Sequence, residues 1–126
     1  MLYHYNFRTY LRKPTLEDKE IRLFLKEIFL EISKEKGFDI IECEILSEHV
    51  HILIEHSYTL STSQVMKFLK GISARRLFQQ YPTNRFEHKK LWGRSFFAKK
   101  ITNEEKDNVI DYIRNQRNEE GIDKRF

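Results

Sequence analysis

The chain has 126 residues, of which 40% are hydrophobic, so it is long enough to form one domain with a hydrophobic core. Its net charge of +4 fits an anionic partner such as nucleic acid, but this mild excess is too common to identify one. The single cysteine, Cys43, excludes an intrachain disulfide, and no apolar run approaches the ~20 residues that cross a bilayer. We therefore expect a soluble, cytoplasmic protein with no membrane contact.

The N-terminal part of the chain predicts a strand followed by a helix. Residues 2–11 are rich in aromatic side chains and predict a strand, which Pro14 ends. Thr15 is the expected N-cap of a helix over about residues 16–36, whose apolar side chains recur at helical spacing. Gly37 is placed to end this helix in a left-handed conformation.

The middle of the chain predicts a hairpin and a second helix. Residues 38–46 and 49–55 alternate like strands and are separated by only two residues, so they are expected to pair as a hairpin. A helix should follow over about residues 64–80, capped by Ser61 or Ser63. Within the first of these strands, the lone cysteine is expected to be a buried, small apolar side chain.

The C-terminal part predicts one more strand and one more helix. Residues 95–101 read as a strand, and Thr102 with Glu105 matches a capping box at the start of a helix over about 103–118. The predicted order is therefore β-α-β-β-α-β-α within a single domain, residues 1–126. This order predicts an α+β, ferredoxin-like (RRM-like) sandwich with an antiparallel sheet of about four strands, helices on one face, and an added C-terminal helix.

Two histidines stand out in the strand over residues 49–55. Side chains at i and i+2 share one face of a strand, so His49 and His51 project together, with Cα atoms roughly 6–7 Å apart. Two imidazoles are too few for a structural zinc site, and a catalytic ion with open positions is the better fit. Glu48 and Glu55 lie close enough in sequence to orient the two rings as hydrogen-bond acceptors.

The other three histidines are isolated in the sequence. His4, His56 and His88 have no histidine or acidic partner at strand or helix spacing that would suggest a site. We expect them to be surface residues without a functional role.

A second candidate group lies on the last predicted helix. Tyr112 and Gln116 are four residues apart, so they share one face of the helix. A tyrosine hydroxyl becomes a nucleophile when a nearby cation lowers its pKa from about 10, and a glutamine oxygen can bind a metal ion. Without that role, Tyr112 would be a half-buried aromatic beside Val109 and Ile113.

These motifs together resemble those of the single-tyrosine HUH transposases, small insertion-sequence enzymes that act on single-stranded DNA, and their repeat-associated relatives. The resemblance covers nearly the whole chain through four segments in the family's order. These segments are EHVHILIE, VMKFLKGISARRLFQQYP, LWGRSFFAKKIT and DNVIDYIRNQ.

The resemblance implies a metal-dependent transposase. His49, His51 and Gln116 would bind a divalent cation, Mg²⁺ or Mn²⁺, without any nucleotide cofactor. Tyr112 would attack a phosphodiester of single-stranded DNA and form a 5′-phosphotyrosine intermediate that can later be rejoined.

The resemblance also implies particular partners. These are single-stranded DNA beside a hairpin and a second copy of the chain, in a homodimer whose active sites could combine histidines of one chain with the tyrosine of the other. Phe86 and Trp92 could stack on unpaired bases. The basic residues expected to contact phosphates are Lys67, Lys70, Arg75, Arg76, Arg85, Lys89, Lys90 and Arg94.

Two other functions stay open from the residues alone. A non-catalytic nucleic-acid-binding module would use the histidines as contacts on the sheet surface and would bury Tyr112. A metal-dependent phosphoesterase with water as its nucleophile would keep the histidines but would not need Tyr112.

Overall fold

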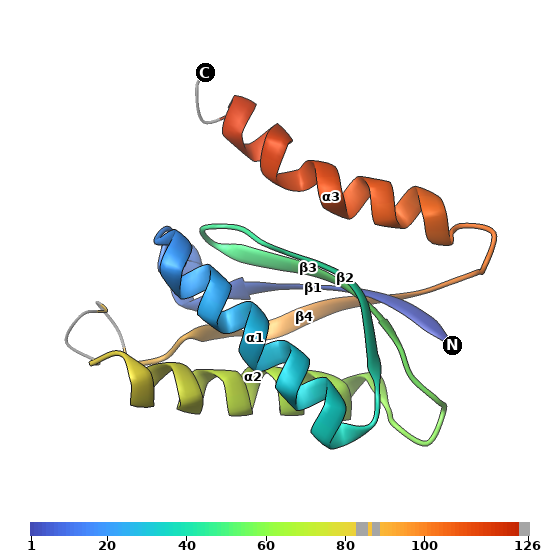
Figure 1. Ribbon diagram of the computed structural model, residues 1–126, viewed down its shortest axis with the longest axis horizontal. Helices are drawn as coiled ribbons and strands as arrows, with labels where there is room; N and C mark the ends of the chain where they lie inside the picture. The colour runs from blue at the N-terminus through green and yellow to red at the C-terminus, as the bar shows by residue number, and fades with distance from the viewer. Residues whose placement is uncertain (83–85, 87–88, 124–126) are drawn as a thin grey trace.

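The computed structural model describes residues 1–82, Phe86 and residues 89–123. Its four strands form one antiparallel sheet in the order β2-β3-β1-β4, which is the expected ferredoxin-like arrangement (Figure 1). The elements, in chain order, are β1 (Leu2–Thr9), the 3₁₀ turn η1 (Tyr10–Arg12), α1 (Lys19–Lys36), β2 (Asp39–Ile45), β3 (His49–Glu55), α2 (Thr62–Gln80), β4 (Trp92–Ile101) and α3 (Lys106–Asp123). None of the helices in these described ranges is long and apolar enough to cross a membrane.

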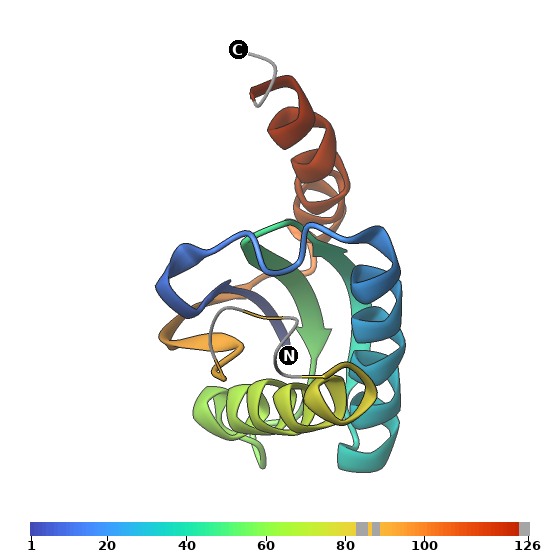
Figure 2. The ribbon, with the colours of Figure 1, turned by 90° about the vertical axis from the view of Figure 1, so that its left-hand side faces the viewer.

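The sheet separates a large core from a small one. Helices α1 and α2 cover one face, and α3 lies across the other (Figures 1 and 2). The strand β3 alternates as predicted, because Val50, Ile52 and Ile54 are fully buried under α1 and α2. The side chains between them project to the face that carries α3.

The large core contains most of the aromatic residues. The rings of Phe7 and Trp92 meet at 4.8 Å in an edge-to-face contact, and Phe29 of α1 packs against both. The small core consists of Leu2, Leu53, Ile101 and Ile113, packed with partly buried Ile41, Val109 and Ile110. It attaches α3 to the sheet through the apolar face of this helix.

The first helix begins later than expected. Its N-cap is Asp18, whose Oδ1 accepts a hydrogen bond from the Glu20 backbone N–H at 2.8 Å, and not Thr15. The physical reason lies in Leu16, which is fully buried and whose N–H donates to the Ser47 carbonyl at 2.9 Å. This contact keeps Thr15 and Leu16 in a turn before the helix, where the Glu17 N–H donates to the Pro14 carbonyl at 3.2 Å. The helix ends at Gly37, with φ of 78°, as predicted.

The strand ends also differ from the prediction. The first strand stops at Thr9, because the following turn places Leu11 and Arg12 at positive φ, a conformation that ends a ladder. The fourth strand begins at Trp92, three residues earlier than expected, and pairs there with Thr9. The hairpin of β2 and β3 has the expected two strands, with a bulge beside Ile41.

The predicted capping box of α3 is present, and α2 begins with a second capping box where the sequence predicted only a cap by Ser61 or Ser63. Ser61 caps α2, and its hydroxyl accepts from the Gln64 N–H while Gln64 accepts from the Ser61 N–H. Thr102 and Glu105 make the same reciprocal pair, although regular α3 starts only at Lys106. Of the two predicted N-cap candidates, Ser61 and Ser63, the structure has Ser61 as the N-cap.

Candidate functional site

The predicted histidine pair lies in the middle of the sheet. His49 and His51 stand on β3, which is hydrogen-bonded to β2 on one side and to β1 on the other. Their ring centroids are 5.0 Å apart at an interplanar angle of 80°. His51 is 4% exposed, whereas His49 is partly open to solvent. Ladders on both sides hold the backbone of the pair rigidly.

A third histidine joins the pair from the neighbouring strand. His4 of β1 lies on the same sheet face, and a hydrogen bond joins its Nε2 to Nδ1 of His51 at 3.2 Å. The two rings are nearly stacked, with centroids 5.4 Å apart. His4 is therefore not the isolated surface residue that the sequence predicted.

The remaining histidines lie elsewhere. His56 is 3% exposed, and its Nε2 hydrogen-bonds the Tyr5 hydroxyl at 2.7 Å while its ring stacks on Tyr3. It is a buried structural histidine and not a surface one. His88 lies outside the described residues.

The surroundings favour the neutral form of His51 and of His4. Burial lowers the pKa of His51 to about 4, and the positive charges of His49, His4 and Arg8 act in the same direction. Burial also lowers the pKa of His4, with a smaller contribution from Lys99. A neutral imidazole keeps a nitrogen lone pair, so these rings are available to a cation at neutral pH.

Tyr112 lies against these histidines. Its ring meets His51 edge-on at 5.7 Å between centroids and His4 at 5.9 Å. The neighbouring Ile113 is fully buried in the small core, but Tyr112 is 49% exposed. An ion pair between Arg114 of α3 and Glu42 of β2, at 2.7 Å, holds the helix in place. Tyr112 thus contacts the histidines and is not buried in a core. The binding-module alternative would require a buried Tyr112.

Gln116 lies one helical turn after Tyr112. Its amide Nε2 donates to the Tyr112 carbonyl at 3.3 Å, so this nitrogen is bonded back to the helix backbone. The structure therefore places Gln116 on the tyrosine helix, as predicted.

The residues at the pair fit a divalent cation. Among the described residues, no group of three or more His, Cys, Asp or Glu is arranged to hold a metal ion, so the two histidines would need other donors. Asn6 pairs with His51 across β1 and β3, and its Oδ1 is buried without a hydrogen-bond partner. An amide oxygen beside imidazole nitrogens gives the mixed donor set that a divalent cation with open coordination positions can use.

Most of the chain matches a known protein family. The family model described as "Transposase IS200 like" matches residues 1–116. The chain belongs to this family. The match confirms the resemblance that the sequence motifs indicated.

Curated members of the IS200-like family share clear sequence similarity with the chain. It is 38% identical over 69 residues to the ISDra2 transposase TnpA of Deinococcus radiodurans, which is 55% of this chain and 47% of that protein. It is 26% identical over 120 residues to the transposase for insertion sequence element IS200 of Salmonella typhimurium, covering 94% of this chain and 78% of the relative. The first match thus spans about half of the relative's length.

Solved structures share the fold of this IS200-like chain. The crystal structure of a Deinococcus radiodurans R1 protein assigned as a transposase superposes with a TM-score of 0.74 and 28% identity, over 92% of this chain and 90% of that chain. A REP-associated tyrosine transposase bound to a REP hairpin superposes with a TM-score of 0.69 over 95% of this chain and 68% of that chain. At 17% identity the second likeness shows the fold alone.

Only some of the basic residues predicted to contact DNA are exposed in this IS200-like protein. Arg76 is ion-paired with Glu31 and Glu35 of α1 at 3.0 Å, and Lys70 Nζ donates to the Ser95 carbonyl at 3.2 Å. Moreover, α2 packs on the sheet face opposite the histidines (Figure 2). The exposed members of the predicted set are Lys67, Arg75, Lys89, Lys90 and Arg94, and Arg85 lies outside the described residues.

Trp92 does not lie at the surface. It is 8% exposed, its Nε1 donates to the Ser73 hydroxyl at 2.9 Å, and its ring packs on Phe7. The expectation that Trp92 stacks on a base is therefore wrong. Phe86 is half-buried and contacts Phe78 of α2 edge-on.

The sequence analysis missed three residues on the histidine face. Phe97 is 55% exposed and contacts His4 edge-on, and Lys99 pairs with His4 across β1 and β4. Arg8 is exposed and pairs with His49 across β1 and β3. Alternation within a strand shows which of its side chains share a face. The faces of two strands can be matched only when the register between the strands is known.

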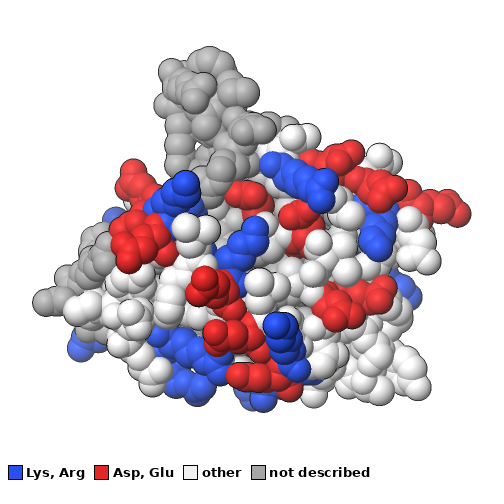
Figure 3. All heavy atoms as spheres, in the orientation of Figure 1, with Lys and Arg blue, Asp and Glu red and all other residues white. Residues whose placement is uncertain are grey.

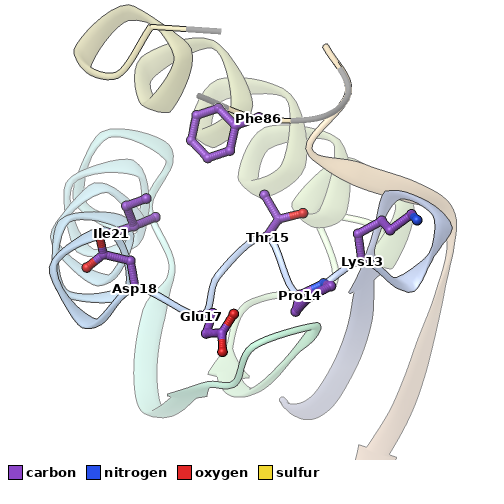
Figure 4. Close-up of a pocket in the computed structure, with 7 residues that line it drawn as sticks. All are labelled: Lys13, Pro14, Thr15, Glu17, Asp18, Ile21 and Phe86. Carbon is purple, nitrogen blue, oxygen red and sulfur yellow. The ribbon is translucent and has the colours of Figure 1, made fainter. Parts of the chain in front are cut away.

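Other surface features lie away from this site. A cavity of about 430 Å³ is lined by the segment before α1, the start of α1 and Phe86, on the α1–α2 side (Figure 4). On the side seen in Figure 3, acidic and basic side chains of the described residues are interspersed and form no large patch of one sign. The cavity lining contains neither the histidines nor Tyr112, so the histidine face is the better candidate for a chemical site.

Proposed function

We propose that the protein is a transposase that cleaves and rejoins single-stranded DNA through a covalent bond to Tyr112. The observation that carries this proposal is the position of the Tyr112 ring, which contacts His51 and His4 while about half of it remains exposed. Membership of the IS200-like transposase family supports the same activity.

The proposed reaction is a transesterification. The Tyr112 hydroxyl loses its proton and attacks phosphorus, the bond to the 3′ oxygen breaks, and that oxygen leaves as a 3′-hydroxyl after gaining a proton. The phosphotyrosine ester conserves the energy of the broken phosphodiester bond. A second 3′-hydroxyl can therefore attack its phosphorus, break the bond to Tyr112, which regains its proton, and rejoin the strand without ATP. A divalent cation held by His49 and His51, with Gln116 as third ligand, would offset charge on the phosphate oxygens.

The proposed substrate is a single strand beside a hairpin. A structural neighbour with the same fold is described as bound to a REP hairpin, which supports a hairpin ligand for this chain as well. On the histidine face, the exposed Phe97 is suited to stack on an unpaired base, with Arg8 and Lys99 beside it to contact phosphates. The homodimer implied by the sequence motifs remains part of the proposal.

The test is a covalent-adduct assay. Purified protein is incubated with Mn²⁺ and single-stranded oligonucleotides from the DNA flanking its gene, and the products are separated on a denaturing gel. We expect a protein-linked DNA band that disappears in Tyr112→Phe and in His49→Ala. Tyr58→Phe is the matched control, because Tyr58 is strongly exposed in a loop away from the histidines.

Other outcomes would favour the alternatives. Cleavage that persists in Tyr112→Phe would indicate a phosphoesterase that uses water as its nucleophile. Tight binding without any cleavage, with all flanking oligonucleotides and with both Mg²⁺ and Mn²⁺, would indicate a binding module.

A further inference from the structure

The two histidines of the pair have different neighbours. The Nδ1 of His49 lies 4.0 Å from a Glu48 carboxylate oxygen, so an acidic acceptor stands beside this ring, as the sequence predicted. The Nδ1 of His51 is instead hydrogen-bonded to another imidazole, at His4 Nε2. Glu55, the other expected acceptor, pairs in register with Leu2 at the far end of β3.

The His4–His51 hydrogen bond determines which nitrogen of His51 is free. A neutral imidazole has one N–H donor and one acceptor nitrogen. If His51 donates from Nδ1, its Nε2 keeps a lone pair for a cation. If His4 donates from Nε2, the proton of His51 is on its own Nε2, and that nitrogen cannot bind a cation.

We propose that His4 is a positioning residue that accepts the Nδ1 proton of His51 and thereby presents Nε2 of His51 to the cation. This inference rests on the proposed cation site at His49 and His51. In this role His4 does for His51 what a carboxylate or carbonyl does for most metal-binding histidines, because the outer partner fixes the tautomer and the ring orientation.

The surroundings of His4 suit this role. Its backbone is held in the ladders of β1 with both β3 and β4. Its ring is enclosed edge-on by Phe97 at 6.4 Å and by Tyr112 at 5.9 Å, so it cannot turn freely away from His51. The charged groups beside the two rings are Lys99 and Arg8, which cannot accept a proton from His51. His4 is therefore the acceptor that the structure offers to Nδ1.

The tautomer can be measured without metal or DNA. Long-range ¹H–¹⁵N NMR spectra of the purified protein distinguish an imidazole protonated on Nδ1 from one protonated on Nε2. We expect His51 to carry its proton on Nδ1 in the wild type, and to lose this preference in His4→Phe. A wild-type His51 protonated on Nε2 would overturn the inference.

The second measurement is Mn²⁺ affinity, followed by calorimetry or by the electron paramagnetic resonance signal of free Mn²⁺. Loss of an outer-shell partner lowers metal affinity by about 10–100-fold, and we expect a decrease in this range for His4→Phe. His4→Gln should stay near the wild type, because its Oε1 can accept the same proton. His56→Gln is the matched control, since His56 hydrogen-bonds Tyr5 and not the pair.

Thermal unfolding without metal separates positioning from folding. If His4→Phe melts like the wild type but binds Mn²⁺ weakly, and His4→Gln restores binding, His4 acts through His51. If His4→Phe binds Mn²⁺ as tightly as the wild type, the inference is wrong while the cation site stands. If wild-type binding is absent or survives His49→Ala, the proposed cation site itself is wrong, and the inference falls with it.

Discussion

Asn6 carries a buried oxygen that has no hydrogen-bond donor within the described part of the chain. An unpaired buried acceptor costs about 1–3 kcal/mol, so Asn6→Val should raise the free energy of unfolding of the metal-free protein by about 1 kcal/mol. Denaturant unfolding followed by circular dichroism measures this change. Arg8→Val is the control for strand propensity, because Arg8 is exposed on the same face of the same strand. A less stable Asn6→Val protein would contradict the prediction.

Cys43 is fully buried in the large core, and burial raises the pKa of its thiol to about 12. The thiolate is the reactive form, so the native thiol should not react with a thiol reagent at about pH 8, where a free cysteine is substantially ionised. We expect no labelling of the folded protein by mass spectrometry and complete labelling in denaturant. Rapid labelling of the native protein would show that β2 opens readily at this position.

The sequence predicted which side chains lie together only where all of them belong to one strand or one helix. His49 and His51 share a face because of the two-residue period of a strand, and Tyr112 and Gln116 share a face because of their four-residue spacing on a helix. The role expected of Tyr112 came from the family resemblance and not from this spacing. The part played by His4 depends on the register of β1 against β3, which no pattern within one strand reveals. The burial of Trp92 likewise depends on Ser73 and Phe7, which lie far from it in the sequence.

The capping pair Thr102 and Glu105 lies at the start of α3, the helix that carries Tyr112. Hydrogen bonds from the backbone and side chain of Thr102 lower the pKa of Glu105 below its usual 4.5. A lowered pKa in the folded state means that this stabilisation is present above about pH 4.5 and is lost as the pH falls through the folded value. We expect amide protection in the first turn of α3 to decrease in that acidic range, measured by hydrogen exchange.

Two variants test the cause of this loss. Glu105→Gln keeps an acceptor for the cap but does not titrate, so its first turn should show less acid dependence than the wild type. Glu105→Ala should show low protection at every pH. An identical acid response in the wild type and in Glu105→Gln would assign the change to other groups.

At the level of elements, the predicted helices and strands exist in the predicted order. The errors lie at their ends, and two of them have a tertiary cause. The burial of Leu16 delays the start of α1, and pairing with Thr9 extends β4 back to Trp92. Such contacts connect distant parts of the chain, so local capping and periodicity cannot predict them.

At the level of the whole molecule, the chain brings its own Tyr112 to its own His51. A mixture of His49→Ala and Tyr112→Phe chains tests whether the active site is formed within one chain. We expect no covalent DNA adduct from the mixture, since each chain lacks one essential residue of its own site. Recovery of adduct in the mixture would show that α3 is exchanged between two copies.

The unequal cores on the two faces have a consequence for motion. The sheet, α1 and α2 share the large core, whereas α3 depends on a small apolar cluster and the Arg114–Glu42 pair. Local opening requires least free energy where the fewest apolar groups are buried, so we expect α3 to open at a lower free energy than the elements around the large core. Tyr112 and the histidines thus belong to parts of the fold that differ in stability. Under the proposed function, undocking of α3 alone would open a path for a DNA strand to the buried His51, without unfolding of the sheet that holds the pair.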